Sequence, residues 1–166
     1  MKDFEDIYYD LLPTAIGDLV FAAGRNGLQT VFFTDKGSSA IPANWRHDPV
    51  AMATVAKQFQ EYFAGTRRKF EVRLSPSGTP FQRRVWQALT EIPYGETITY
   101  KELAERAGSA RGYRAAGNAN GRNPLVILQP CHRVVAANNG IGGFSSGIFR
   151  KRFLLELEGI DRSQFR

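Results

Sequence analysis

The chain has 166 residues, of which 43% are hydrophobic, and a net charge of +6. This length allows one large domain or two small ones with a packed core. No apolar run is long enough to span a membrane, and the acidic start MKDFEDIYYD lacks the apolar centre of a signal peptide. Together with a single cysteine, these features predict a protein of a reducing, intracellular compartment such as the cytoplasm.

The positive charge lies entirely in the second half of the chain. Residues 1–78 carry nine Lys/Arg and nine Asp/Glu, whereas residues 79–166 carry 13 and seven, a surplus of 13 − 7 = 6. An ordinary basic surface could give this count. The asymmetry nevertheless favours a second half that faces a polyanion such as nucleic acid.

The first half has the pattern of strands followed by a helix. An apolar and aromatic run and two β-rich segments are expected to pair, at 5–12, 18–23 and 28–34. Asn26-Gly27 is a hairpin turn signal between the last two. Helical periodicity predicts a helix from Pro49 to Ala64, which Gly65 ends, and a short strand at 69–74. Residues 75–78 are expected to form a linker.

Two capped helices are predicted next. Thr79 is an N-cap with Gln82 as its capping-box partner, and the helix runs to about Thr90. Thr99 is a second N-cap, with Glu102 as its partner, for a helix that ends at Ala107. A further helix at about 111–121 follows a glycine-containing turn, and this pair of short helices predicts a helix-turn-helix.

The helix at 111–121 carries almost no bulky side chains, as Arg114-Ala115-Ala116-Gly117-Asn118-Ala119-Asn120-Gly121 shows. Its thinness suits entry into a minor groove about 6 Å wide. Close packing against another helix would explain the small residues equally well, so both interpretations stay open.

The single cysteine, Cys131, precedes one of only two histidines, His132. A thiol beside a base is the minimum for nucleophilic chemistry, although a buried structural thiol is common. A short buried strand is predicted at 125–128, followed by Val134-Val135 and a turn at 138–140. The segment 141–147 is a glycine-rich loop, and a last helix is expected at about 148–158.

Several of these motifs together closely resemble the O6-alkylguanine-DNA alkyltransferases. They are the run PCHRVV with Asn123-Pro124 upstream, the segment Ile92–Tyr100, and the closing Leu154–Gly159. The likeness covers about residues 78–160. The first half resembles the family only in length, in strand-helix order, and in the ending Tyr62-Phe63-Ala64-Gly65.

The resemblance implies an α+β fold with two domains. Residues 1–75 would form a small β-sheet with a helix, RNase H-like in the family. Residues 76–166 would form a helical domain with a winged-helix-like helix-turn-helix and the active-site loop. The implied function is direct repair, in which the protein flips O6-alkylguanine from duplex DNA and keeps the alkyl group irreversibly, once per molecule.

The resemblance also implies the catalytic residues. Cys131 matches the alkyl acceptor, His132 the base that takes its proton through a water, and Glu158 the carboxylate that orients the histidine. Asn123 matches a residue that joins the turn and helix around the site. Tyr100 matches the tyrosine whose hydroxyl donates to guanine N3.

The DNA contacts and pocket follow by the same likeness. Arg114 matches the arginine that fills the gap left by the flipped base. The small-residue helix would meet the minor groove of double-stranded DNA through Arg114, Ala115, Gly117, Ala119 and Asn120. The base pocket would include Val134, Phe144 and Ser145. Phe144 stands where many members have tyrosine, so ring stacking is retained and a hydroxyl is lost.

The expected protein is a monomer without cofactor. Some family members hold a structural zinc in the first domain, but this chain has no cysteine there, so no metal is expected. Two alternatives remain: a non-catalytic lesion sensor, a class in which tryptophan replaces the cysteine, and a hydrolase with a Cys-His-Glu triad. Whether O4-alkylthymine is also accepted stays open.

Overall fold

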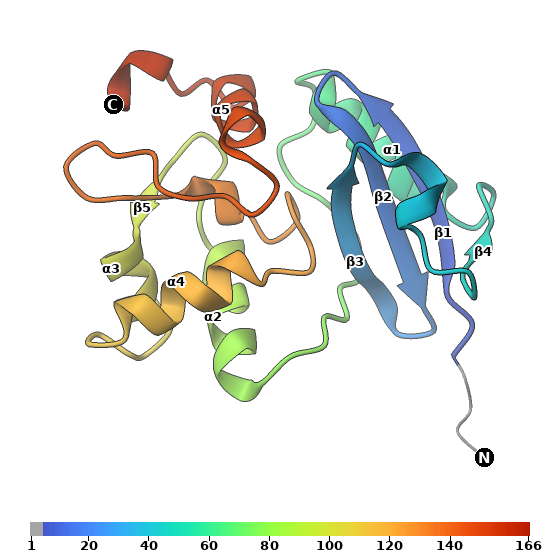
Figure 1. The fold of residues 1–166 in the computed structure, drawn as a ribbon, viewed down its shortest axis with the longest axis horizontal. Helices are drawn as coiled ribbons and strands as arrows, with labels where there is room; N and C mark the ends of the chain where they lie inside the picture. Colours follow the sequence, from blue (N-terminus) through green and yellow to red (C-terminus); the bar gives the residue numbers. More distant parts are fainter. Residues whose placement is uncertain (1–4) are drawn as a thin grey trace. The chain divides into compact units, whose positions relative to one another are not determined.

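The computed structural model describes residues 5–166, and its contacts divide the chain into two compact units between Pro76 and Ser77. Each unit is described separately (Figure 1). Within residues 5–166 no helix is long and apolar enough to cross a membrane.

The first unit is a four-stranded sheet with one α-helix. Its elements are β1 (Tyr8–Thr14), β2 (Gly17–Gly24), β3 (Gly27–Thr34), the 3-10 helix η1 (Gly37–Ala40), β4 (Arg46–His47) and α1 (Ala53–Phe63). The strand order is β3-β2-β1-β4, in which only β4 runs parallel to its neighbour. Helix α1 packs on the sheet through Phe59, whose ring centroid lies 5.3 Å from that of Phe21 in β2.

The predicted hairpin between β2 and β3 is confirmed, but its turn lies one residue earlier, at Arg25-Asn26, with Gly24 paired to Gly27. Gly27 has φ +130°, and a Cβ there would lie 2.5 Å from the carbonyl oxygen of Arg73. Glycine is therefore required at this position by both conformation and space.

Two predictions in this unit are wrong in detail. The segment 69–74 does not form a strand. Only Leu74 makes an isolated β-bridge, to Leu28, and its hydrogen bonds join Leu28 to Arg73 and Ser75. Helix α1 starts at Ala53 rather than Pro49, because the Asp48 carboxylate accepts a hydrogen bond from the Ala51 amide and holds the preceding residues in turns.

The second unit is mainly helical. Its elements are α2 (Pro80–Thr90), β5 (Ile98–Thr99), α3 (Tyr100–Arg106), α4 (Tyr113–Gly121), η2 (Cys131–Arg133), β6 (Val134–Val135), α5 (Ile148–Leu157) and η3 (Arg162–Gln164). The two short strands pair in parallel. Both predicted capping boxes are present, Thr79 with Gln82 and Thr99 with Glu102.

The packing of helix α4 accounts for its small residues. Ala116, Ala119 and Asn120 are buried, and the Trp86 indole of α2 donates to the Ala119 carbonyl oxygen across 2.8 Å. The opposite face leaves Arg114 and Ala115 exposed. The helix therefore packs closely on one side and presents a thin surface on the other, so the two interpretations of its composition are compatible.

The strand predicted at 125–128 is wrong. Leu125 forms only an isolated bridge and residues 126–128 form a turn, in which Ile127 has φ +72°. The Asn123 carboxamide oxygen accepts from the Leu125 amide, and the Gln129 amide donates to the Leu125 carbonyl oxygen, so local bonds replace strand pairing. Residues 125–128 are all buried, which accounts for the apolar run.

Candidate active site around Cys131

Cys131 lies in the single turn η2, where its thiol is free and only 2% of the residue is exposed. The turn before it is fixed by Asn123. The Asn123 side chain donates to the Gln129 carbonyl oxygen (2.6 Å) and accepts from the Gln129 carboxamide (2.7 Å) and the Leu125 amide (2.9 Å). Asn123 follows α4, so these bonds join the end of that helix to the cysteine turn.

His132 and Glu158 meet in the protein interior. The imidazole Nε2 lies 2.8 Å from Oε1 of Glu158, and both side chains are fully buried. An ionised carboxylate can only accept, so Nε2 must donate and Nδ1 carries the lone pair of the neutral ring. Nδ1 has no hydrogen-bond partner within residues 5–166. It is therefore the nitrogen available to receive a proton.

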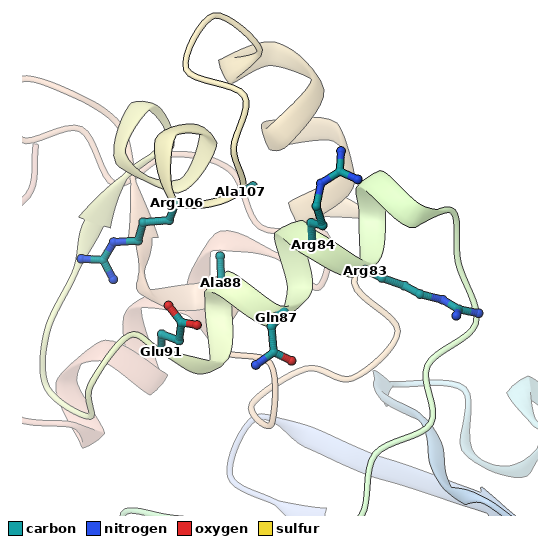
Figure 2. Close-up of a pocket in the computed structure, with 7 residues that line it drawn as sticks. All are labelled: Arg83, Arg84, Gln87, Ala88, Glu91, Arg106 and Ala107. Carbon is teal, nitrogen blue, oxygen red and sulfur yellow. The ribbon is translucent and has the colours of Figure 1, made fainter.

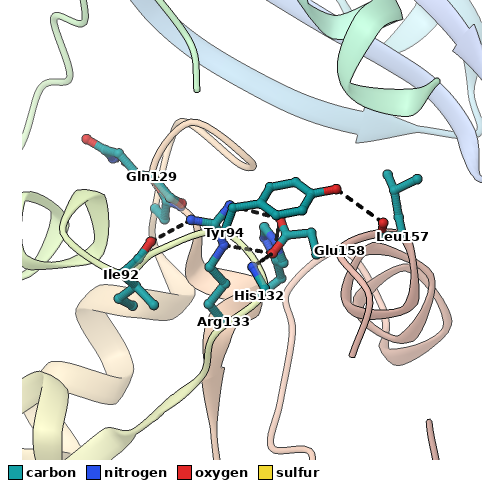
Figure 3. A network of polar contacts seen from close by, with 9 residues as sticks. Ile92, Tyr94, Gln129, His132, Arg133, Leu157 and Glu158 are labelled. Carbon is teal, nitrogen blue, oxygen red and sulfur yellow. Dashed lines mark hydrogen bonds and ion pairs between the residues drawn. The ribbon is translucent and has the colours of Figure 1, made fainter. Parts of the chain in front are cut away.

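Arg133 completes this network (Figure 3). Its guanidinium holds Glu158 in two parallel contacts, Nε to Oε2 at 2.8 Å and Nη2 to Oε1 at 2.9 Å. Burial alone would raise the pKa of Glu158. The hydrogen bonds and charges of His132 and Arg133 outweigh burial and hold that pKa far below its usual range.

Lys151 is a buried residue of the site that the sequence interpretation missed. Its ammonium, with no exposed surface, donates to the carbonyl oxygens of Val134 (2.6 Å) and Gly143 (3.0 Å). Burial lowers its pKa to about 8, against the opposing effect of a thiolate at Cys131. Lys151 occupies the same helical stripe as the buried Leu154 and Leu155, and this spacing was the signal that could have identified it.

The thiol and the imidazole are both neutral at rest. Burial raises the pKa of Cys131, although a hydrogen bond from Asn123 and the charge of Lys151 oppose the shift. Burial also lowers the pKa of His132, opposed by Glu158. A neutral thiol beside a neutral imidazole needs proton transfer before it can act as a nucleophile.

A cavity of about 180 Å³ lies at the predicted base pocket, lined by Tyr100, Gly117, Asn120, Gly121, Gly143, Phe144 and Ser145. Of the predicted pocket residues, Phe144 and Ser145 line it, whereas Val134 is buried in β6 and is not among the lining residues. Burial raises the pKa of Tyr100, so its hydroxyl stays a donor, and it lies 3.5 Å from the Gly143 carbonyl oxygen.

Gly117 and Asn120 were predicted to contact DNA. In the structure both residues line this cavity rather than an exposed face of α4. Gly117 faces the Tyr100 ring, and a Cβ at Gly117 would lie 3.6 Å from it. Asn120 is 5% exposed, and its Oδ1 is buried without a hydrogen-bond partner in the described part of the chain. Contact of these two residues with DNA stays a prediction, now directed at a base in the pocket.

Basic side chains gather elsewhere on this unit. A hollow of about 330 Å³ lies beside α2 and the end of α3. Figure 2 shows the residues that line it, which are Arg83, Arg84, Gln87, Ala88, Glu91, Arg106 and Ala107. Its three arginines form no ion pair with any described residue. Arg114 is likewise exposed in the first turn of α4. These unpaired charges agree with a surface that meets a polyanion.

Residues 5–166 contain no group of three His, Cys, Asp or Glu side chains that could hold a metal ion.

Comparison with known proteins identifies both units. Residues 7–76 match the 6-O-methylguanine DNA methyltransferase ribonuclease-like domain, and residues 80–160 match the DNA binding domain of the same name. The fold and site thus define a two-part protein of the α+β class, with a ribonuclease-like sheet and a helical DNA-binding domain.

Similar proteins cover nearly the whole chain. The methylated-DNA–protein-cysteine methyltransferase of Methanosarcina barkeri is 44% identical, over 92% of this chain and 97% of its own. The protein of that name from Mycobacterium tuberculosis is 42% identical, over 92% of each chain. The crystal structure of the M. tuberculosis O6-methylguanine methyltransferase superposes with a TM-score of 0.84, at 41% identity and 92% coverage of each chain. A structure of the M. tuberculosis protein in complex with DNA gives 0.83, at 42% identity over 95% of this chain and 94% of the other. The chain belongs to the 6-O-methylguanine DNA methyltransferase family.

Proposed function

We propose that this protein repairs alkylated DNA by moving the alkyl group of O6-alkylguanine onto Cys131. The observation that carries the proposal is the buried chain of contacts from His132 to Glu158 and Arg133, placed directly after the only cysteine. The domains would be residues 1–75 and 76–166. The protein would work where the DNA is, in the cytoplasm or nucleoid, as a monomer.

The proposed step is a displacement at carbon. Cys131 Sγ attacks the alkyl carbon, so an S–C bond forms while the C–O6 bond breaks, and the bonding electron pair remains on guanine. The thiol proton passes to Nδ1 of His132, relayed by a water, and the imidazolium later releases it to solvent, from which the leaving guanine takes up one proton. The products are S-alkylcysteine and unmodified guanine, so atoms and charge balance without a cofactor.

The nucleophile, base and orienting acid are arranged as in other activated thiols. A neutral His132 can accept the proton because Nδ1 is free, and Glu158 stabilises the imidazolium that forms. Lys151 supplies positive charge as the thiolate develops. Tyr100 would donate to N3 of the leaving guanine, on which negative charge accumulates.

The target atom lies inside the base stack, so the nucleotide must be flipped into the cavity beside Tyr100 and Phe144. The exposed face of α4 would contact the minor groove of duplex DNA, with Arg114 filling the gap left in the stack. The unpaired arginines of the same unit would contact phosphates. A thioether is not reversed under mild conditions, so each molecule would act once.

Intact-protein mass after incubation with duplex DNA containing O6-methylguanine tests the proposal. Transfer predicts a gain of one methylene per protein molecule and no further gain with excess DNA. A non-catalytic lesion sensor or a hydrolase predicts no gain, and either result would refute the proposed function.

A further inference from the structure

Each of the three guanidinium nitrogens of Arg133 makes a hydrogen bond (Figure 3). Nη1 donates to the Ile92 carbonyl oxygen (2.6 Å), while Nε and Nη2 donate to the two carboxylate oxygens of Glu158. The Tyr94 ring lies 5.7 Å from Cζ, and the Tyr94 hydroxyl donates to the Leu157 carbonyl oxygen, 3.2 Å away. A planar fork fixed at three nitrogens has little freedom to rotate.

This fork fixes the plane of the Glu158 carboxylate. Oε2 accepts from Arg133 and from the Gly95 amide (3.3 Å), whereas Oε1 accepts from both Arg133 and His132. Bidentate contact imposes geometry as well as charge. The direction from which Oε1 meets the imidazole is therefore set by Arg133.

The same contact balances charge beside the imidazole. A buried carboxylate with no other partner would favour the imidazolium form of His132, which cannot take a proton from a thiol. The ionic groups that face His132 are Glu158, Arg133 and Lys151, and the two cations oppose the carboxylate. Arg133 is the cation that neutralises Glu158 directly.

We propose that Arg133 is a positioning residue that orients the Glu158 carboxylate and keeps His132 neutral, so that the imidazole can accept the Cys131 proton. This inference rests on the proposed alkyl transfer. It assigns to Arg133 a part distinct from DNA binding, although it is one of the basic residues of the positively charged half of the chain.

The first test is the pH dependence of alkyl transfer from free O6-benzylguanine, which requires no base flipping. Arg133→Met removes the cation that neutralises Glu158, so His132 should stay protonated to a higher pH. The acid limb of the rate profile should therefore shift to higher pH, by about one pH unit or more. The rate near pH 6 should fall on the order of 10-fold and recover as the pH rises. A loss that is equal at all pH values, or no loss, would overturn the proposal.

A matched control is Arg162→Met, which breaks an exposed Arg–Glu pair in the same unit, 3.2 Å between Arg162 Nε and Glu156 Oε1. This variant should keep the wild-type profile. A shift of the acid limb here like that of Arg133→Met would show that the effect is a general response to lost positive charge, and would also overturn the proposal.

A second test needs no activity. The chain has only two histidines, so the imidazole C–H signals of His132 and His47 can be followed separately by NMR. Arg133→Met should raise the pKa of His132 above its wild-type value, with His47 in the other unit as the internal control. An unchanged or lower value for His132 contradicts the inference.

Arg133→Lys keeps the test decisive if Arg133→Met does not fold. Lysine retains the charge and loses the fork, so the acid limb should stay near that of the wild type while the rate falls about 10-fold at every pH. Wild-type rates for Arg133→Lys would show that the guanidinium is not needed to orient the Glu158 carboxylate, and would overturn that part of the proposal. Failure of the proposed function would appear separately, as a wild-type protein that gains no benzyl mass.

Discussion

The buried ammonium of Lys151 donates a hydrogen bond to the Gly143 carbonyl oxygen across 3.0 Å. Lys151 belongs to α5, and Gly143 to the loop that forms one wall of the cavity. The Tyr100 hydroxyl reaches the same carbonyl oxygen at 3.5 Å. The Gly143 carbonyl oxygen thus accepts from two residues of the site: Lys151, on the helix that leads to Glu158, and Tyr100, the proposed hydrogen-bond donor to guanine.

Lys151→Met should slow alkyl transfer by about 10- to 100-fold, the range expected for the loss of a charge-assisted hydrogen bond. The variant loses both the wall contact and the charge that favours the thiolate of Cys131. Transfer from free O6-benzylguanine, followed by protein mass over time, measures the effect. Arg152→Met on the same helix is the control, and equal slowing of both variants would contradict the role of Lys151.

Glu158→Gln should destabilise the protein at neutral pH by roughly 3–5 kcal/mol, because it leaves the buried Arg133 without a counter-charge. The pKa of Glu158 is depressed in the folded state, so its stabilisation is full above the ordinary value of 4.5 and is lost as the pH falls below it. Urea unfolding at several pH values should therefore show the gap between wild type and variant narrowing below pH 4.5. A gap that stays constant from pH 7 to pH 3 would contradict this.

Arg114→Ala should slow repair of duplex DNA much more than reaction with free O6-benzylguanine. Arg114 is exposed on α4, apart from the buried network, and the free base needs no flipping. Single-turnover rates with both substrates measure the difference. Equal slowing with both substrates would mean that Arg114 supports the cavity rather than the duplex.

Tyr100→Phe should cost roughly 1–3 kcal/mol of barrier, the scale of a hydrogen bond to a group that gains charge. Phe144→Tyr should change the rate only slightly because Tyr100 already supplies the donor. Both rings line the cavity, so the pair is a matched comparison of the two hydroxyl positions. A harmless Tyr100→Phe, or a tenfold faster Phe144→Tyr, would show that the donor is assigned to the wrong ring.

Local chemistry made much of the helical unit predictable. The capping boxes at Thr79 and Thr99 use residues three positions apart, so the sequence alone fixes where α2 and α3 begin. The turn at Asn138-Asn139 was also predictable from local sequence. Asparagine tolerates the left-handed backbone conformation, and both residues adopt a positive φ.

Long-range contacts were not predictable in this way. Residues 125–128 are apolar because they are buried, and the Asn123 side chain, not a partner strand, satisfies the Leu125 amide. Arg133 finds Glu158 25 positions away and Ile92 41 positions away, so its sequence neighbours give no sign of its partners. Cys131, His132 and Glu158 were identified by resemblance, and the structure then showed how the last two meet.

The most direct test of the account is the mass of the tryptic peptide that spans residues 123–133. This peptide, NPLVILQPCHR, contains the only cysteine of the chain. After reaction with duplex DNA that carries O6-methylguanine, it should be heavier by one methylene, with fragment ions that place the methyl group on Cys131. Cys131→Ala should bind the same DNA with nearly unchanged affinity and gain no mass. A methyl group found on any other residue, or transfer that persists in Cys131→Ala, would contradict the account.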